Sequence, residues 1–285
     1  MNGKVYLVGA GPSDVGLLTL KAKWALERAD VVVYDALVGA AILALVPAGA
    51  KCINVGKRAR NHTRTQNEIN QILLEEAQKG QTVVRLKGGD PFLFGRGGEE
   101  LELLAEHGVP YEIVPGITSA IAVPAYNGIP VTHRDFCSSL HIVTAHKRRD
   151  EPLDIDLTSL VRLNGTLVFL MGVTALPAIC QGLLDAGMAP DMPAAVLHRG
   201  TSARQKRVVS TLAALSEAAR DMEAPSIIVV GRVCALASDF AWAERLPLFG
   251  RRFLVTRPKE RASRLTDKLR ALGAEVVEFP TIELQ

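Results

Sequence analysis

Residues 83–100 read Val-Val-Arg-Leu-Lys-Gly-Gly-Asp-Pro-Phe-Leu-Phe-Gly-Arg-Gly-Gly-Glu-Glu, and this stretch decides the fold. Val83 and Val84 are typical of a buried strand, Gly88-Gly89-Asp90-Pro91 ends it, and a helix is predicted to begin near Glu99. A strand that runs into a glycine turn and then a helix leaves main chain open at the carboxyl edge of a sheet, where α/β folds bind ligands. An ordinary tight turn explains a single Gly-Gly pair equally well, so the interpretation depends on the other loops.

The rest of the chain repeats the alternation of strand and helix. Strands are expected at 4–9, 31–34, 51–55, 82–86 and 111–114, and helices at 17–28, 40–46, 65–79, 99–107 and 119–126, with Thr65 as an N-cap. This order predicts an α/β fold whose first sheet is parallel and covered by helices. Around Gly200-Thr201 two strands follow each other without a helix, which predicts a mixed second sheet.

The length of 285 residues predicts two domains and leaves room for a fragment of a third. Gly128-Ile129-Pro130 marks one boundary and Phe249-Gly250 another, which gives domains at 1–133 and 134–248 and a fragment at 249–285. The fragment contains a single predicted β-α-β unit, which cannot bury a sheet of its own.

Composition excludes several classes of protein. Residues 250–285 hold eight Lys or Arg and five Asp or Glu, which accounts for the whole net charge of +3, so the basic pI is no argument for nucleic-acid binding. No apolar run is long enough to span a membrane, and no signal peptide is expected. The cysteines are Cys52, Cys137, Cys180 and Cys234, without a Cys-x-x-Cys pair, so we expect reduced thiols in the cytoplasm and no metal site.

Basic residues recur where predicted strands end. They are Arg58, Arg60, Arg64, Arg85, Lys87, Arg96 and Arg134. Such residues are usually solvated surface. In a parallel sheet, however, they are expected to share one edge with the glycine loops, which favours a small molecule rich in carboxylates held by arginine forks.

Gly9-x-Gly11 follows the first predicted strand, and Asp35 ends the second, as in dinucleotide-binding folds. Asp14 stands where the third glycine of that motif belongs, and Pro12 stiffens the turn. A nicotinamide cofactor is therefore only an alternative, and a plain βα turn explains these residues as well.

Taken together, these stretches resemble the tetrapyrrole methylase family and, within it, the uroporphyrinogen-III C-methyltransferases. The matching stretches are residues 8–22, 29–35, 55–58 with His62, Gln66 and Asn70, 85–92, 115–120, 128–134, 170–172, 200–201 with Gln205, and 229–231. The pairing of Gly56-Lys57-Arg58 with Gly128-Ile-Pro-Val-Thr-His-Arg134 is the most specific part. Ser13 and Val15 depart from the family's usual first loop. The resemblance covers about residues 1–245.

The resemblance implies an activity. It is the methylation of uroporphyrinogen III at C2 and C7 by S-adenosyl-L-methionine, which gives precorrin-2 through precorrin-1 for siroheme or cobalamin biosynthesis. It also implies S-adenosyl-L-homocysteine as a product, no metal, no nucleic-acid or membrane partner, and a cytoplasmic homodimer. Alternatives are a methyltransferase acting on a later precorrin, a nicotinamide-dependent tetrapyrrole oxidoreductase and a tetrapyrrole carrier.

The resemblance also implies roles for single residues. Asp35 is the implied proton acceptor, although it suits loop capping too, and Lys57 is the implied proton donor, although it suits pairing with a substrate carboxylate. The implied cofactor contacts, in a site between the two domains, are Pro12, Gly88, Gly89, Asp90, Leu93, Thr118, Ser119, Met171 and Gly200. The expected substrate contacts are Arg58, Arg64, Arg96 and Arg134.

The segment after Phe249 carries a second resemblance. Residues 252–258, Arg-Phe-Leu-Val-Thr-Arg-Pro, together with Leu269-x-x-x-Gly-Ala-x-Val-x-x-x-Pro280, look like the start of a uroporphyrinogen-III synthase. Only the opening of such a domain is present, so no synthase activity is expected from this chain.

Overall fold

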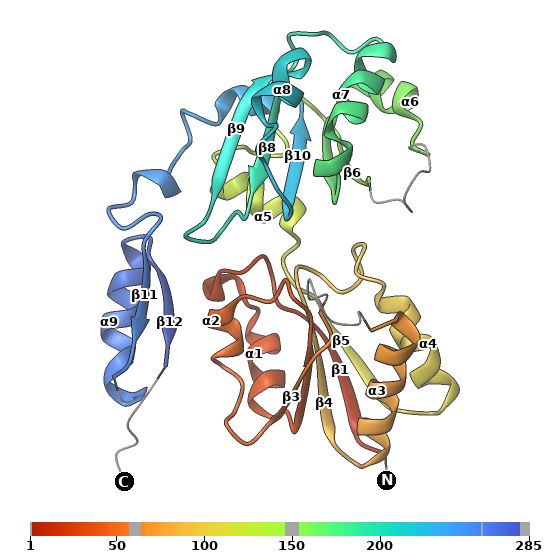
Figure 1. The fold of residues 1–285 in the computed structure, drawn as a ribbon, viewed down its shortest axis with the longest axis vertical. Coiled ribbons are helices and arrows are strands. Elements are labelled where there is room, and N and C mark those ends of the chain that lie inside the picture. The colour runs from red at the N-terminus through yellow and green to blue at the C-terminus, as the bar shows by residue number, and fades with distance from the viewer. Residues whose placement is uncertain (1, 57–63, 146–153, 258, 280–285) are drawn as a thin grey trace. The chain divides into compact units, whose positions relative to one another are not determined.

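The computed structural model describes residues 2–56, 64–145, 154–257 and 259–279 (Figure 1). The chain forms two compact units. The first comprises residues 1–118, 252–268 and 275–285, and the second comprises 119–251 and 269–274. The units divide between Thr118 and Ser119 rather than near Gly128, because α5 (Ser119–Tyr126) buries Ala120 and Val123 against the second sheet.

The first unit is built on a parallel sheet, as predicted. Its strands are β1 (Lys4–Gly9), β2 (Val31–Tyr34), β3 (Lys51–Asn54), β4 (Thr82–Lys87) and β5 (Tyr111–Val114), in the order β3-β2-β4-β1-β5. Every pairing in it is parallel. The carboxyl ends of all five strands therefore meet at one edge.

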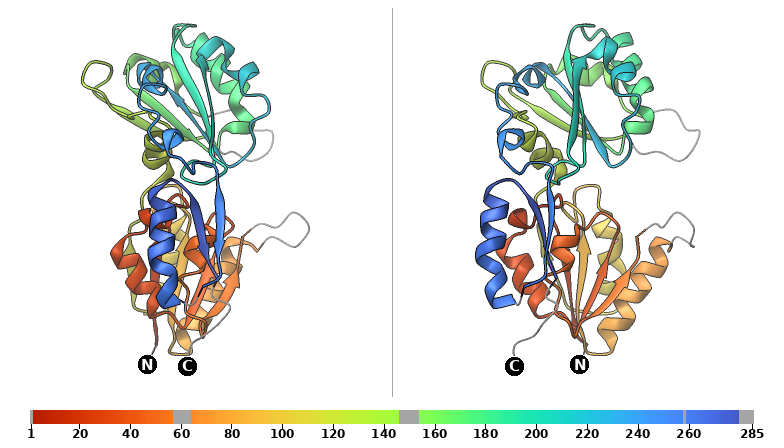
Figure 2. Two further views of the ribbon diagram at one scale, coloured as in Figure 1. Left: turned by 90° about the vertical axis from the view of Figure 1, so that its left-hand side faces the viewer. Right: turned by 60° about the vertical axis from the view of Figure 1, so that its left-hand side comes forward.

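Helices cover both faces of this sheet (Figure 2). One face packs against α1 (Leu20–Glu27) and α2 (Ala40–Leu43), and the other against α3 (Gln66–Gln78) and α4 (Gly97–Glu106). β1 leads into α1 and the adjacent β4 leads into α4, so the chain leaves these neighbouring strands toward opposite faces. Ligands of open α/β sheets bind at such a switch point.

The predicted start of α3 is confirmed. The Thr65 hydroxyl accepts a hydrogen bond from the main-chain N–H of Glu68, and the Glu68 carboxylate accepts one from the N–H of Thr65. This capping box satisfies two main-chain donors that a helix start otherwise leaves open.

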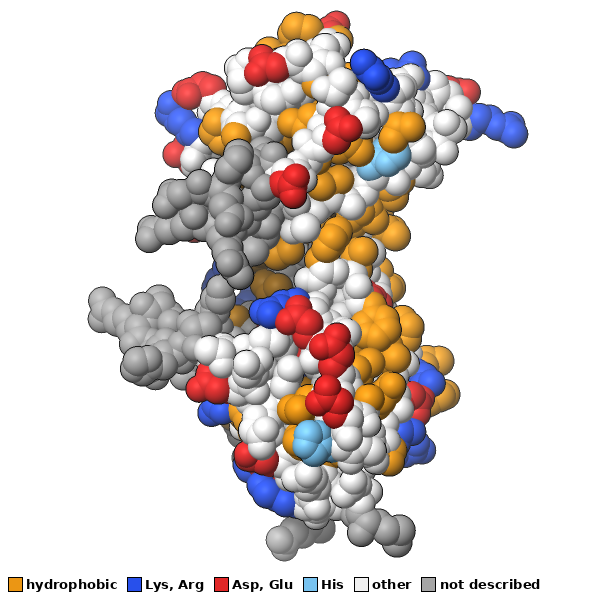
Figure 3. All heavy atoms as spheres, turned by 90° about the vertical axis from the view of Figure 1, so that its right-hand side faces the viewer, with side chains coloured by type: hydrophobic (Ala, Val, Ile, Leu, Met, Phe, Trp, Pro, Cys, Tyr) orange, Lys and Arg blue, Asp and Glu red, His pale blue; other side chains and the backbone are white. Residues whose placement is uncertain are grey.

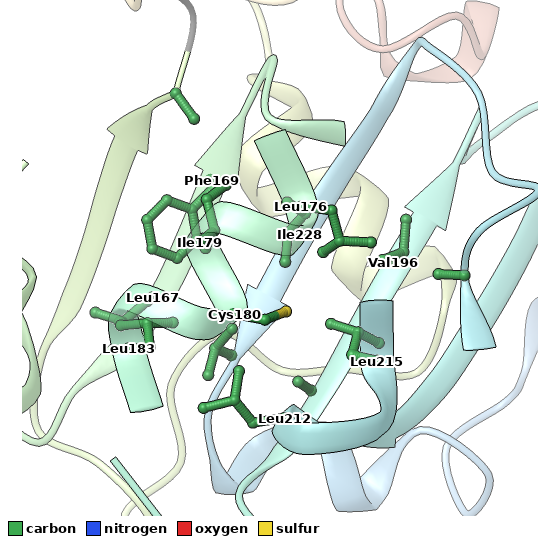
Figure 4. Packing of buried hydrophobic residues seen from close by; sticks show 14 residues of the cluster. Leu167, Phe169, Leu176, Ile179, Cys180, Leu183, Val196, Leu212, Leu215 and Ile228 are labelled. Carbon is green, nitrogen blue, oxygen red and sulfur yellow. The ribbon is translucent and has the colours of Figure 1, made fainter. Parts of the chain in front are cut away.

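The second unit holds the predicted mixed sheet. Its strands are β6 (Leu140–Thr144), β7 (Thr166–Leu170), β8 (Pro193–His198), β9 (Lys206–Thr211) and β10 (Ser226–Val230), in the order β6-β7-β10-β8-β9. Only β6 and β7 are parallel. The helices α6 (Leu157–Arg162), α7 (Leu176–Asp185) and α8 (Leu212–Ala218) bury apolar side chains on one face (Figure 4), and α5 covers the other.

The last segment forms β11 (Arg252–Val255), α9 (Lys259–Ala271) and β12 (Glu275–Glu278), with the two strands parallel. Within the described residues, no helix combines the length and apolar character needed to cross a membrane.

A carboxylate of the first sheet predicts a pH-dependent stability. Glu112 of β5 pairs with Lys21 of α1 and accepts a hydrogen bond from Lys4 Nζ at 2.5 Å, and these bonds lower the pKa of Glu112 from 4.5 to about 2. A lowered folded-state pKa contributes stability that is present above the unfolded pKa and is lost as the pH falls toward the folded pKa.

We therefore expect Glu112→Gln to lower the free energy of unfolding at pH 7. The difference in this free energy between the variant and the wild type should shrink steadily below about pH 4.5. Urea unfolding at several pH values measures it. Glu27→Gln is the control, because Glu27 forms only an exposed pair with Lys23 at 3.7 Å and should change little at any pH. A Glu112→Gln difference that does not vary with pH would contradict the pairing.

Candidate functional site

Main-chain hydrogen bonds join the loops that follow β1 and β4. Gly11 N–H donates to Gly89 O at 3.1 Å, and Gly89 N–H donates to Gly11 O at 2.8 Å. Ala10 N–H donates to Lys87 O at 2.7 Å. Gly11 and Gly89 have φ of +70° and +69°, which is the left-handed region that glycine adopts without strain. The two loops that flank the switch point therefore form one fixed unit.

Close packing of main chains gives a physical reason for the other glycines. A Cβ on Gly9 would lie 2.5 Å from Gly116 Cα and 2.7 Å from Gly89 O. A Cβ on Gly88 would lie 2.6 Å from Leu37 Cβ. At Gly9 and Gly88 the missing side chain thus makes room for the protein's own loops, a reason that the sequence analysis, with its choice between a tight turn and the approach of a ligand, did not include.

Asp90 ties the loop after β4 to the loop after β5. One carboxylate oxygen accepts hydrogen bonds from the N–H groups of Phe92 (2.8 Å) and Leu93 (3.1 Å). The other oxygen accepts one from Gly116 N–H at 3.0 Å. Asp90 therefore holds the loop in shape through main-chain bonds, besides any contact it makes with a ligand.

Asp35 lies at the same edge, directly after β2. Its Oδ1 accepts a hydrogen bond from Leu37 N–H at 2.9 Å, and its Oδ2 is 3.9 Å from Arg85 Nη1. The side chain is 25% exposed. Asp35 thus caps its own turn, as one interpretation expected, and still presents one carboxylate oxygen next to a buried cation.

The placement of Arg85 and Lys87 corrects the sequence analysis. Both were expected to face a ligand from the edge of the sheet, but both are buried in β4 and donate to Glu100 of α4, Arg85 Nε at 3.1 Å and Lys87 Nζ at 2.8 Å. Side chains alternate along a strand, so these two point to the same face, which is covered by α3 and α4. Sequence reasoning missed Glu100, although two cations on a buried strand require a buried anion.

Exposure distinguishes Glu100 from its neighbours on α4. Glu99, Glu102 and Glu106 are exposed, and Figure 3 shows acidic side chains gathered on this side of the first unit. Glu100 faces inward and is fully buried. Burial and the charge of Arg85 lower the pKa of Lys87, while the Glu100 carboxylate counteracts part of that effect.

The other predicted residues of the first unit lie on these loops, except Arg64, which directly precedes Thr65, the N-cap of α3. Pro12, Leu93 and Thr118 are half-buried. Arg64 is exposed, and Arg96 is exposed and forms a two-bond ion pair with Glu99, its Nε lying 2.8 Å from Glu99 Oε1. Lys57 and Arg58 lie outside the described residues, so their predicted roles stay predictions.

In the second unit, Met171 and Gly200 lie at one edge of the sheet. Met171 follows β7 and Gly200 follows β8, and both strands run antiparallel to β10, so they end on the same side. Gly200 is in close contact with Val123 of α5, and a Cβ there would clash with the Val123 side chain. Ser119 is the first residue of α5.

Arg134 does not join Met171 and Gly200 in this unit. Its loop lies where β6 and β7 begin, because Cys137 Sγ is 3.2 Å from Thr166 Oγ1 and Thr166 N–H donates to Ser139 O at 3.0 Å. Met171 follows the opposite end of β7. The premise that the loop of Arg134 follows a strand is therefore wrong, since this loop precedes β6, and the predicted contact of Arg134 with the substrate stays a prediction.

Strained main chain marks the same loops. Among the described residues, the non-glycine residues with positive φ are Ser13, Phe94, Arg96, Asn164, Met171, Arg199 and Thr201. All but Asn164 belong to or flank the loops that carry Pro12, Leu93, Met171 and Gly200. Such conformations cost about 1–3 kcal/mol each and concentrate at functional sites. No group of three His, Cys, Asp or Glu side chains suited to a metal ion occurs in the described part of the chain.

Three known proteins illustrate what the chain is similar to. The S-adenosyl-L-methionine-dependent uroporphyrinogen III methyltransferase of Methanosarcina barkeri is 53% identical over 82% of this chain and 93% of its own length. The porphyrin biosynthesis protein HemD of Ruminiclostridium josui is 54% identical over 99% of this chain, which spans only 56% of that protein. The structure of the uroporphyrin-III C-methyltransferase of Thermus thermophilus complexed with S-adenyl homocysteine superimposes with a TM-score of 0.71, at 40% identity, over 82% of this chain and 99% of that one.

The family model described as tetrapyrrole (corrin/porphyrin) methylases matches residues 4–216, which include the whole first sheet and the strands β6 to β9 of the second. With the fold, the glycine-tied loops and these similarities in agreement, the chain belongs to the tetrapyrrole methylase family.

Proposed function

We propose that the chain is an S-adenosyl-L-methionine-dependent C-methyltransferase that acts on uroporphyrinogen III. The observation that carries the proposal is its 53% identity to a methyltransferase of that name over 93% of the relative's length. The loops tied together at the switch point of the first sheet support it, because they form a preformed edge for a small ligand.

We also propose that the substrate is methylated twice, at C2 and C7, to give precorrin-2 by way of precorrin-1. Cytoplasmic location and a homodimeric state belong to the same proposal. Residues 249–285 are proposed to be the start of a uroporphyrinogen-III synthase-like domain. Support for this last part comes from the β-α-β order of the segment and from the Ruminiclostridium relative, whose similarity extends through it.

The residues present fit the proposed methyl donor. Met171 is 47% exposed, and its main chain has a φ of +57°. Its polarizable thioether is therefore accessible to an adenine ring. Gly88, Gly89, Leu93 and Pro12 would hold the donor from the first unit. When bound, the donor supplies an electrophilic methyl group on a sulfonium.

The protein's own contribution is to orient the reactants and to move a proton. Asp35 is the proposed proton acceptor, because its carboxylate is fixed by Leu37 N–H and one oxygen stays accessible at the ligand edge. Lys57 is the proposed proton donor. Positioning provides most of the acceleration in such a site, and an acid–base pair adds about 10²–10⁴-fold.

An assay with a labelled methyl donor and uroporphyrinogen III tests the function. The expected product carries two labelled methyl groups and the mass of precorrin-2. Spectral titration with NAD should show no binding, whereas S-adenosyl-L-methionine should bind. A protein that binds the donor but transfers no methyl group to this acceptor would refute the proposed substrate.

The packed glycines predict a loss of both stability and donor binding in Gly9→Ala. The new Cβ meets main-chain atoms of Gly116 and Gly89, which cannot move aside as a side chain can, and such overpacking costs about 1–3 kcal/mol. Thermal unfolding and calorimetric titration with S-adenosyl-L-methionine measure the two effects.

Gly98→Ala is the matched control. A Cβ on Gly98 meets nothing within 4 Å, and the residue lies in α4, so alanine should stabilise the protein by up to about 1 kcal/mol and leave donor affinity unchanged. Equal behaviour of the two variants would show that the contact among the three loops does not matter.

Asp35→Asn is expected to lower kcat by about 10²-fold or more, because the amide keeps the bond to Leu37 N–H but cannot accept the proton. Donor affinity should change less than threefold. Asp30→Asn is the control, since Asp30 also accepts a main-chain bond, from Thr82 N–H at 2.8 Å, but precedes β2 at the other edge. Wild-type turnover in Asp35→Asn would remove Asp35 from the reaction.

A further inference from the structure

Three charged side chains are buried together between β4 and α4. Glu100 is 0% exposed, Arg85 4% and Lys87 7%. Removing such charges from water costs several kcal/mol each, and a buried ion pair often contributes no more stability than apolar side chains of the same size. Stability alone therefore does not explain why the sheet carries this cluster at its ligand edge.

The cluster holds the Arg85 guanidinium in one orientation. Glu100 Oε1 accepts hydrogen bonds from Arg85 Nε at 3.1 Å and from Lys87 Nζ at 2.8 Å. On its other side, Arg85 Nη1 donates to Leu86 O at 3.1 Å and to Val33 O at 3.4 Å. Three acceptors from β2, β4 and α4 thus fix the position of this guanidinium.

α3 supports the same carboxylate. Gln66 Nε2 lies 3.3 Å from Glu100 Oε1 and 2.9 Å from Asn70 Oδ1. Asn70 Nδ2 donates to Glu99 O at 2.8 Å, which ties α3 to the start of α4. The position of Glu100 is therefore defined by two helices and a strand.

The atom that the cluster fixes is the one that faces Asp35. Arg85 Nη1 lies 3.9 Å from Asp35 Oδ2. Among the described residues, the charged groups paired here are Arg85 and Lys87 from β4, Glu100 from α4 and Asp35 from the loop after β2. The exposed pair Arg96–Glu99 at the start of α4 acts on Glu100 and Lys87 through its charges, and α3 contributes the neutral Gln66 and Asn70. Without the Glu100 charge, Asp35 would be the remaining carboxylate paired with Arg85 among the described residues, and Arg85 would be drawn toward it.

A second buried glutamate provides a comparison within the same unit. Glu76 Oε1 accepts bonds from Lys51 Nζ at 2.7 Å and Lys79 Nζ at 2.9 Å, and the side chain is 7% exposed. As in Glu100, the Oε2 atom is buried without a hydrogen-bond partner among the described residues. Glu76 lies near the start of β3, at the edge opposite the site, and it does not contact Asp35 or Arg85.

We propose that Glu100 is a positioning residue for the reaction, which acts through Arg85 to keep the Asp35 carboxylate in place and able to accept a proton. The inference rests on the proposed function and adds a residue outside the ligand-contacting loops. Glu100 itself touches neither donor nor acceptor.

The experiment compares Glu100→Gln with Glu76→Gln. Both substitutions remove one buried charge that is paired with two cations, so both should lower the free energy of unfolding. Only Glu100→Gln should lower kcat, by about tenfold or more, with KM for both substrates changed less than threefold.

The inference is overturned if Glu100→Gln has a kcat within twofold of that of Glu76→Gln, or if its kcat falls only together with a matching change in KM. Near-ultraviolet circular dichroism shows whether the glutamine variants fold. If either does not, Glu100→Asp and Glu76→Asp give the same comparison, because the shorter side chain keeps the negative charge but moves it away from the paired cations. Wild-type protein that does not methylate uroporphyrinogen III would refute the proposed function instead, which is a distinct result.

Discussion

Contact between main chains at the carboxyl edge of the first sheet is the constraint on which the site depends. Gly11 and Gly89 exchange two hydrogen bonds, Gly9 packs against Gly116, and Asp90 bonds the loop that contains Gly116. Three connections that are far apart in the sequence are thereby held at one point. The parallel order of the sheet brings these loops to the same edge, and the absence of side chains lets them touch.

Buried charge is the second organising feature of this unit. Glu100 and Glu76 each neutralise two cations, one cluster at the ligand edge and the other at the opposite edge. In the Glu100 cluster both cations are buried with the carboxylate, so hydrogen bonds must offset the desolvation, whereas Lys51 and Lys79 around Glu76 are more than half exposed to solvent. The two clusters differ in what lies beside them, since only Arg85 reaches a carboxylate of the proposed reaction.

Much of the architecture could be predicted from local pattern. Alternation of strand and helix predicts the parallel sheet, the pair of strands around Gly200-Thr201 predicts the mixed one, and Thr65 as an N-cap predicts the start of α3. Long-range side-chain contacts were not predictable in this way. The charges of Arg85 and Lys87 give no sign of which face of β4 they occupy, and that face depends on the register of the strand. The loop of Arg134 was expected to follow a strand, whereas it follows α5 and leads to the start of β6.

The hydrogen bonds of Asp90 have a consequence for how the protein meets its ligand. Phe92, Leu93 and Gly116 satisfy the carboxylate from within the chain, so the loop has its shape before anything binds. A preorganised loop does not lose further conformational entropy on association, and more of the contact free energy is then expressed as affinity. A loop that keeps one shape contributes equally to the affinity for the methylated and the demethylated cofactor. Any difference in affinity between the two must therefore come from the groups around the sulfur.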